Sequence, residues 1–218
     1  MSDVENPQEF EEFPKIARLS RDCVITEKLD GTNAQVFITT DGTILTGSRT
    51  QWITPEKDNH GFAKWVAENK DEILTLGPGR HYGEWWGSGI QRGYGLTKGE
   101  KRFSLFNTHR WALHGTKPKL LTREDDPAPR YQEMLPPCVG LVPVLYEGLF
   151  STDACYAAVE DLRINGSKAA PGFMNPEGIV CFHQAAYVGF KKTLKDDNVP
   201  KSVADALAQK EYAKRATS

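Results

Sequence analysis

Short apolar segments separated by turn-forming residues are the feature that most limits how this chain can fold. Segments 23–27, 34–39 and 103–106 are each four to six residues long, and Asp30-Gly31 and Asp41-Gly42 punctuate the first part of the chain. Runs of this length, with Asp-Gly between them, predict β-strands joined by tight turns. We therefore expect a fold that is rich in antiparallel strands.

Helical spacing appears in only a few places. The segment 61–74 has apolar residues at helical intervals, and Asn59 is positioned to cap it. Ser151 precedes a second expected helix that runs to Arg163, with Gly166 just beyond its end. Further strands are expected at 43–46, 81–86, 141–146, 179–183 and 187–191, and a last helix at 202–214. Residues 115–137 are rich in proline, glycine and charge and predict an excursion. The sum is one α+β domain.

Bulk composition excludes several classes of protein. The chain has 218 residues, a length that suits one domain, and no apolar run approaches the roughly 20 residues that span a bilayer. Residues 1–13 are acidic and lack the pattern of a secretion signal, so we expect a cytoplasmic protein with no membrane contact. The four cysteines form no C-x-x-C pair, and the histidines lack metal-ligand spacing. A zinc site is therefore not expected.

The net charge of −2 means that a nucleic-acid enzyme needs a local basic face. Two groups of basic residues are candidates: Arg92, Lys98, Lys101 and Arg102 in one, and Lys191, Lys192 and Lys195 in the other. For the first group, an ordinary solvated surface is an equally good interpretation.

The sequence Lys28-Leu29-Asp30-Gly31 suggests chemistry as well as a turn. It puts a lysine nucleophile at the end of an expected strand and a carboxylate two residues later, and glycine permits the turn. Residues two apart in an extended segment point to the same side, so Lys28 and Asp30 can face one pocket. Such a short motif also fits a plain turn, so further motifs are needed to choose between the two interpretations.

Those further motifs occur in order along the chain. They are Glu27–Asn33 (EKLDGTN), Gly47-Ser48-Arg49, Tyr82–Arg92 (YGEWWGSGIQR), Phe103–Asn107 (FSLFN), Pro176–Val180 (PEGIV) and Phe190-Lys191-Lys192. On these motifs the chain resembles the covalent nucleotidyltransferase superfamily of ligases and capping enzymes. Within it, the chain most resembles the nick-sealing class of ATP-dependent RNA ligase.

The resemblance implies a fold and an activity. The fold is a nucleotidyltransferase (adenylation) domain, in which antiparallel β-sheets are flanked by helices and the nucleotide lies between them. The activity is formation of a covalent lysyl-AMP, transfer of AMP to a 5′-phosphate end, and joining of that end to a 3′-hydroxyl. RNA or RNA-containing duplex ends are the implied substrate.

The resemblance also implies a role for each matching residue. Lys28 is the adenylated nucleophile, Arg49 contacts the ribose or a phosphate, and Phe106 stacks on adenine. Glu84 binds a ribose hydroxyl or orients metal waters, Glu177 organises the metal, and Lys191 contacts the α-phosphate. The cofactors are ATP, as the AMP donor, and Mg²⁺ or Mn²⁺. Chemistry agrees, because phosphoryl transfer needs cations on the phosphate oxygens and carboxylates near a metal. Those carboxylates are Asp30, Glu84 and Glu177, acting directly or through water.

The chain departs from the resemblance near its end. Relatives often have a second lysine two positions after Lys191, where this chain has Thr193, so either Thr193 or Lys192 assists Lys191. We expect residues 1–195 to form the nucleotidyltransferase domain and residues 196–218 a helix and tail, without a separate accessory domain. A partner protein or self-association could then help to hold the substrate. Two alternatives stay open: a GTP-dependent capping-type guanylyltransferase, and a nucleic-acid-binding module without catalysis.

Overall fold

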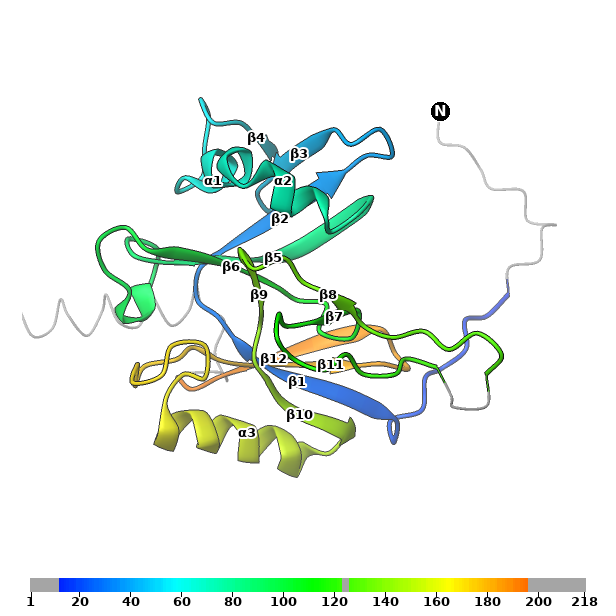
Figure 1. The fold of residues 1–218 in the computed structure, drawn as a ribbon. Coiled ribbons are helices and arrows are strands. Elements are labelled where there is room, and N and C mark those ends of the chain that lie inside the picture. Colours follow the sequence, from blue (N-terminus) through cyan, green and yellow to red (C-terminus); the bar gives the residue numbers. More distant parts are fainter. Residues whose placement is uncertain (1–11, 123–125, 196–218) are drawn as a thin grey trace, which may run out of the picture.

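Two β-sheets lie one above the other, with the helices on their outer faces (Figure 1). The computed structural model describes residues 12–122 and 126–195, so the expected helix at 202–214 lies outside the described residues. The six-stranded sheet has the order β4 (Trp52–Ile53), β3 (Ile44–Gly47), β2 (Thr32–Ile38), β5 (Gly79–Gly87), β6 (Lys101–Leu105) and β9 (Val139–Leu141). The four-stranded sheet has the order β10 (Val144–Leu149), β1 (Asp22–Lys28), β11 (Gly178–His183) and β12 (Val188–Thr193).

Buried apolar side chains alternate along the strands, so each sheet has one apolar face that packs against helices and forms a hydrophobic core. Helices α1 (Phe62–Glu68) and α2 (Lys70–Leu74) cover one face of the six-stranded sheet, where Phe62 packs against Trp85 and Phe103. Helix α3 (Thr152–Asn165) packs on the four-stranded sheet. A third cluster joins the two sheets, because it combines residues from β5, from the loop between β5 and β6, from both chain crossings and from the loop after α3. Its buried members are Leu29, Trp86, Tyr94, Val142 and Ala170.

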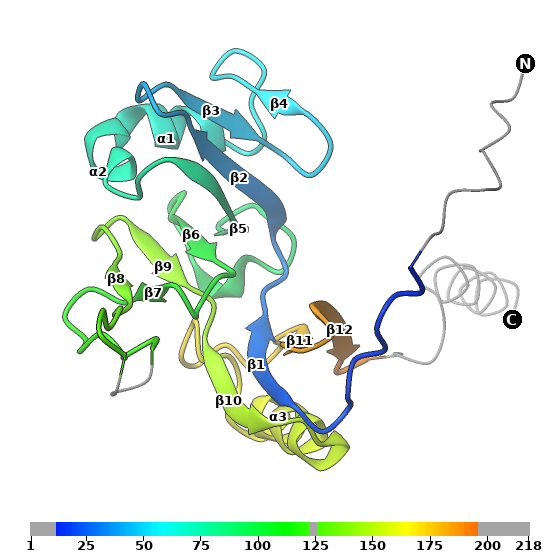
Figure 2. The same ribbon diagram turned by 90° about the vertical axis from the view of Figure 1, so that its right-hand side faces the viewer.

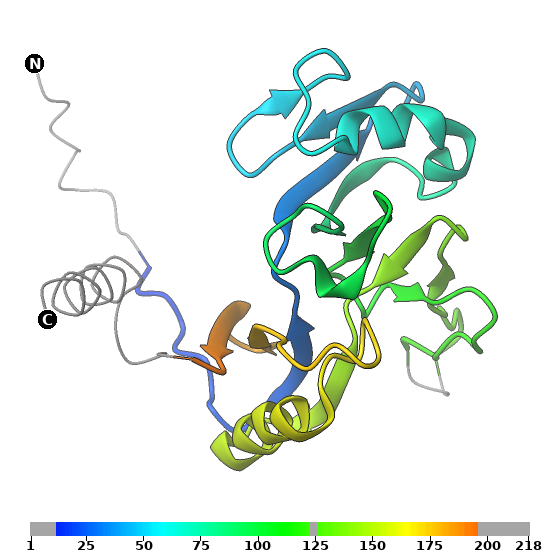
Figure 3. The ribbon, with the colours of Figure 1, turned by 90° about the vertical axis from the view of Figure 1, so that its left-hand side faces the viewer.

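The chain crosses directly between the sheets in two places. Figures 2 and 3 show β1 of the lower sheet continuing into β2 of the upper one, and β9 continuing into β10 beside it. Only residues 29–31 separate β1 from β2, and only Val142-Pro143 separates β9 from β10. The Glu27 amide donates to the Pro143 carbonyl oxygen at 2.9 Å and so ties the two crossings together. Asp30-Gly31 is therefore a link between sheets, not the turn of a hairpin.

The prediction of one strand at 141–146 is wrong. Its first part lies in β9, which pairs in parallel with β6, and its second part lies in β10, which pairs antiparallel with β1. Pro143, between them, has no N–H to donate to a sheet, so the ladder ends there. The β6–β9 pair is parallel, so the six-stranded sheet is mixed, whereas the four-stranded sheet is antiparallel throughout. The small separate pair of β7 (Trp111–Ala112) and β8 (Glu133–Met134) is also parallel.

The helix expected at 61–74 is two short helices that meet at Asn69, where φ is −109° and ψ is 24°. The N-cap residue of the first helix is Gly61, and Asp58 rather than Asn59 accepts hydrogen bonds from its first turn. The Asp58 carboxylate accepts the Ala63 and Lys64 amides at 2.8 and 3.0 Å, whereas Asn59 donates its side-chain amide to the Thr32 hydroxyl.

The second helix is confirmed. The Ser151 hydroxyl accepts the Ala154 amide at 3.0 Å, and α3 ends at Asn165, immediately before Gly166. Across residues 12–122 and 126–195, no helix is long and apolar enough to cross a membrane.

Candidate active site

The amine of Lys28 lies against the carboxylate of Glu177. Lys28 is the last residue of β1, and Glu177 immediately precedes β11, the antiparallel neighbour of β1. The distance from Lys28 Nζ to Glu177 Oε2 is 2.5 Å, and both side chains are less than about a third exposed. The glycine after Glu177 lets β12 lie close to this end of β11, because Gly178 has φ +155° and a Cβ there would meet the Lys192 carbonyl oxygen at 2.2 Å.

Arg92 joins the link between the sheets to the segment that carries Glu177. Its Nε lies 2.7 Å from Asp30 Oδ2, and its Nη1 donates to the carbonyl oxygens of Asn175 and Pro176 at 3.1 and 3.3 Å. The sequence groups Arg92 with Lys98, Lys101 and Arg102 as a candidate basic face. The structure places its guanidinium inside the site, where it holds Asp30 and positions the residues just before Glu177.

Glu84 lies beside these two ion pairs. It projects from β5, where its two carboxylate oxygens accept the Gly31 amide at 3.0 Å and the Asn33 side-chain amide at 3.2 Å. Burial raises the pKa of Glu84 to about 7, helped by the charges of Glu177 and Asp30, while the Gly31 amide and Lys28 oppose the rise. Lys28 and the three predicted carboxylates are therefore close enough to act on one another electrostatically.

Tyr94 fixes the backbone on both sides of Leu29. Its hydroxyl accepts the Asp30 amide at 2.9 Å and donates to the Lys28 carbonyl oxygen at 3.4 Å. The ring is buried edge-on against Trp86, and burial raises the pKa of the phenol, so it stays protonated. Sequence reasoning missed Tyr94, which has φ +51° and lies in the 3₁₀ turn Gly93–Gly95 of the glycine-rich loop.

The register of β12 separates the two residues proposed to assist Lys191. Lys191 and Thr193 alternate with Lys192, and pairing through β11 aligns Thr193 with Lys28. Lys192 faces the opposite side, where its ammonium lies 5.2 Å from the centre of the Tyr156 ring of α3. Thr193, rather than Lys192, shares the Lys28 face with Lys191.

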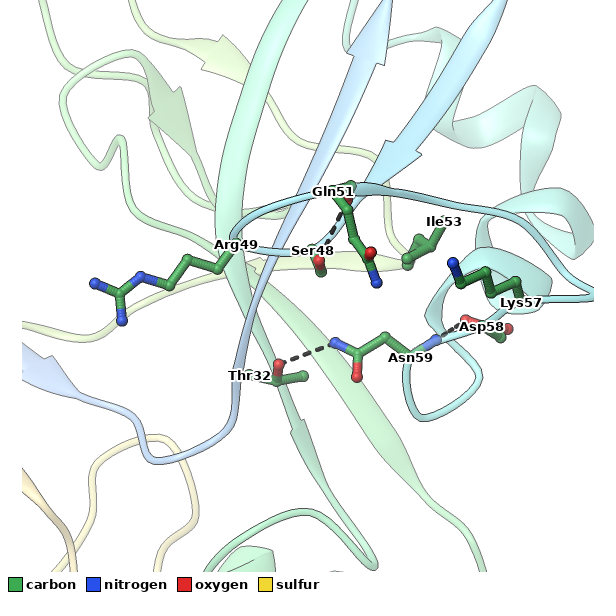
Figure 4. Close-up of a pocket in the computed structure, with 8 residues that line it drawn as sticks. All are labelled: Thr32, Ser48, Arg49, Gln51, Ile53, Lys57, Asp58 and Asn59. Carbon is green, nitrogen blue, oxygen red and sulfur yellow. Dashed lines mark hydrogen bonds between the residues drawn. The ribbon is translucent and has the colours of Figure 1, made fainter.

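The remaining predicted residues lie farther out. Arg49 follows β3 and lines an open pocket of about 370 Å³, whose other lining residues are Thr32, Ser48, Gln51, Ile53, Lys57, Asp58 and Asn59. Its guanidinium points away from Gln51 and Lys57 (Figure 4). Phe106 immediately follows β6 and is 43% exposed. Among the described residues, neither Arg49, Phe106 nor Lys191 hydrogen-bonds to Lys28 or its neighbouring carboxylates.

The three carboxylates fit a hydrated metal ion better than a directly bound one. No three His, Cys, Asp or Glu side chains in the described part of the chain converge to hold a metal. Glu177 is paired with Lys28, Asp30 with Arg92, and Glu84 accepts two N–H groups. Carboxylate oxygens nonetheless suit Mg²⁺ or Mn²⁺, and Mg²⁺ usually keeps several of its waters. The residues present therefore fit contact through water.

Comparison with known proteins now identifies the family. A family model described as RNA ligase matches residues 21–195, which span every residue of the site. The chain belongs to the RNA ligase family. A comparison with curated protein sequences finds no match.

Solved structures of another RNA ligase are similar to this RNA ligase family member. One Naegleria gruberi RNA ligase variant, solved with ATP and Mn, is 16% identical with a TM-score of 0.51, over 81% of this chain and 51% of that chain. A second variant with ATP and Mn is 18% identical with a TM-score of 0.49, over 81% and 51%. A third, with AMP and Mn, is 18% identical with a TM-score of 0.47, over 80% and 50%. The chain thus spans about half the length of these structures.

Proposed function

We propose that this protein is an ATP-dependent RNA ligase that carries AMP covalently on Lys28. The observation that carries the proposal is the Lys28–Glu177 pair at the junction of the two sheets, with Glu84 and Asp30 beside it. A lysine amine held against a carboxylate, next to further carboxylates and a bridging arginine, is suited to attack on a metal-bound nucleoside triphosphate.

The proposed reaction has three steps. Lys28 Nζ forms a bond to the α-phosphorus of ATP, the bond to the bridging oxygen of the β-phosphate breaks, and pyrophosphate leaves. A 5′-phosphate oxygen then displaces the lysine and takes AMP, and a 3′-hydroxyl displaces AMP from that end. The amine must lose a proton before it attacks, and Glu177 Oε2, at 2.5 Å, is the acceptor already in contact with it.

The other predicted residues surround this centre. We propose that adenine stacks on Phe106, that Arg49 and Lys191 neutralise phosphate charge, and that Thr193 assists Lys191 from the same sheet face. A divalent ion on the triphosphate would supply further charge neutralisation, with its waters held by Glu84 and Glu177. The nucleotide would then lie between the two sheets.

The test is covalent labelling. Purified protein is incubated with Mg²⁺ and ATP labelled at the α- or the γ-phosphate, then denatured and separated by electrophoresis. We expect label from α-labelled ATP only, and none on Lys28→Ala. Full labelling of Lys28→Ala would falsify the nucleophile assignment.

Two further arms of the same experiment test the alternatives. Labelling with GTP in place of ATP would indicate a guanylyltransferase. Nucleic-acid binding without any labelling would indicate a module that lacks catalysis. Sealing of a nicked duplex with RNA on its 3′-hydroxyl side then tests whether the labelled protein is a ligase.

A further inference from the structure

A row of exposed aromatic side chains crosses the six-stranded sheet beside the candidate active site. The registers align Trp52 on β4 with Gly47 on β3, Gln35 on β2 and Tyr82 on β5. Phe106 extends the row, because its amide donates to the Tyr82 carbonyl oxygen at 3.0 Å. Trp52, Tyr82 and Phe106 are 46%, 52% and 43% exposed. Large aromatic rings are seldom left this exposed in line without a ligand.

These side chains occupy the face of the sheet that α1 and α2 do not cover. Residues aligned across neighbouring strands share a face, and residues two apart along a strand share it too. Tyr82 is two residues from Glu84 along β5, so the row lies directly beside the position of that carboxylate. With neighbouring strands about 4.8 Å apart, the row from β4 to β6 is roughly 19 Å long.

Arg80 adds a positive charge to this face. It lies two residues from Tyr82 along β5, and its guanidinium carbon is 4.5 Å from the centre of the Phe37 ring and 5.4 Å from that of Trp52. Its hydrogen bond goes to the neutral side chain of Gln35, at 3.1 Å. Within residues 12–122 and 126–195 Arg80 forms no ion pair with a carboxylate. Stacking on two rings holds the guanidinium in place while its charge is left for a ligand.

We propose that this surface, formed by Gln35, Phe37, Trp52, Arg80 and Tyr82, binds a single-stranded segment of the nucleic-acid substrate. Aromatic rings offer stacking to unpaired bases, and a guanidinium without a carboxylate partner attracts the phosphate backbone. The row continues into the site through Phe106 and the neighbouring Glu84, so a strand that lies on it ends at the reacting groups. The inference rests on the proposed function, which supplies nucleic acid as the substrate.

The same protein contains a matched control. The Arg110 guanidinium lies 4.4 Å from the Trp111 ring centre, but Arg110 also pairs with Glu133 at 3.0 Å. Its charge is therefore already compensated. Arg110→Ala removes a stacked arginine of the same kind from a different part of the surface, and it should leave nucleic-acid binding unchanged.

The experiment measures the binding of fluorescent single-stranded RNA to the full chain by anisotropy. Wild type is compared with Trp52→Ala, Arg80→Ala and Arg110→Ala at several salt concentrations. We expect Trp52→Ala to weaken binding about tenfold, which is within the range for one base–aromatic stack. Arg80→Ala should weaken binding similarly at low salt and lower the slope of log affinity against log salt by about 0.7. Trp52→Phe should restore most of the lost affinity.

Self-adenylation without nucleic acid separates this inference from the proposed function. Trp52→Ala and Arg80→Ala should label with ATP within about twofold of wild type. If wild type does not label but RNA binding depends on both residues, the proposed function fails and the surface assignment stands. If labelling is normal and neither substitution changes RNA affinity, the surface assignment is wrong. It is also wrong if light scattering shows a wild-type dimer that Trp52→Ala dissociates, because the row is then an interface between two copies.

Discussion

Replacing Glu84 by glutamine should change how the stability of the nucleotide-free protein depends on pH. Glu84 is only 8% exposed, and its pKa is raised from 4.5 to about 7 in the folded chain. Between these two values the unfolded chain ionises Glu84 while the folded chain keeps it protonated. The folded state therefore loses stability as pH rises through this window, and Glu84→Gln, which does not ionise, is spared that loss.

The size of the pKa shift of Glu84 gives the expected change in unfolding free energy. Each pKa unit is worth about 1.4 kcal/mol, so moving from 4.5 to about 7 corresponds to about 3 kcal/mol. Glutamine can accept only one of the two N–H groups that Glu84 accepts, which costs about 1 kcal/mol at every pH. Relative to the variant, wild type should thus lose about 3 kcal/mol of unfolding free energy between pH 4 and pH 8. For a chain of this length that is about 6–12 °C in melting temperature.

The assay is thermal unfolding of both proteins from pH 4 to pH 8, with a chelator and without nucleotide. Only the difference between the two proteins is interpreted, because the titrating groups that do not interact with Glu84 then cancel. The control is Glu68→Gln, since Glu68 is an exposed residue of α1 and its variant should follow wild type to within about 0.5 kcal/mol. If the gap between wild type and Glu84→Gln is the same at every pH, then Glu84 is not held neutral by burial.

Three further changes test other parts of the molecule. Phe106→Ala should weaken ATP binding about 10- to 100-fold and leave the melting temperature unchanged, measured by calorimetric titration; unfolding at normal affinity would instead show a core role. Arg92→Ala should slow self-adenylation at least about tenfold in the absence of nucleic acid, with partial recovery in Arg92→Lys. Arg102→Ala should have no effect, and equal rates in all three variants would show that Arg92 does not contribute to self-adenylation. Ser151→Ala should cost about 1 kcal/mol in denaturant unfolding at unchanged labelling, and no loss would mean that α3 does not depend on its cap.

Much of the site could be predicted because the motifs are local. Lys28 ends a strand as expected, and Glu84 and Glu177, which the motifs assign to the same site, lie near it in the structure. Arg92 and Tyr94 could not be assigned in the same way. Both residues contact Asp30, which is more than 60 residues earlier in the chain. Both also lie in a glycine-rich loop, whose sequence has no periodicity that would predict where their side chains point.

The sequence predicts the secondary structure well where a local pattern of apolar residues determines it. The prediction fails where pairing between distant strands determines the structure. The apolar stripe of 61–74 correctly predicted that Phe62, Val66 and Ile73 are buried, but not the break at Asn69 or the capping by Asp58. The segment 141–146 has the composition of one strand, yet its two halves pair with strands that are distant from each other in sequence. A composition that favours a strand does not say which sheet the strand joins.

The two adjacent crossings between the sheets also determine how the molecule can bend. Any rocking of one sheet against the other must flex both short links, 29–31 and Val142-Pro143, at once, because the Glu27–Pro143 hydrogen bond couples them. The axis of such a motion runs through the links, and displacement grows with distance from it. In such a motion Lys28, which adjoins the axis, would move little, whereas Trp52, on the edge strand β4, lies away from both links and would move more. If Lys28 is the nucleophile, its place beside the axis would hold it in position while the proposed nucleic-acid surface moves.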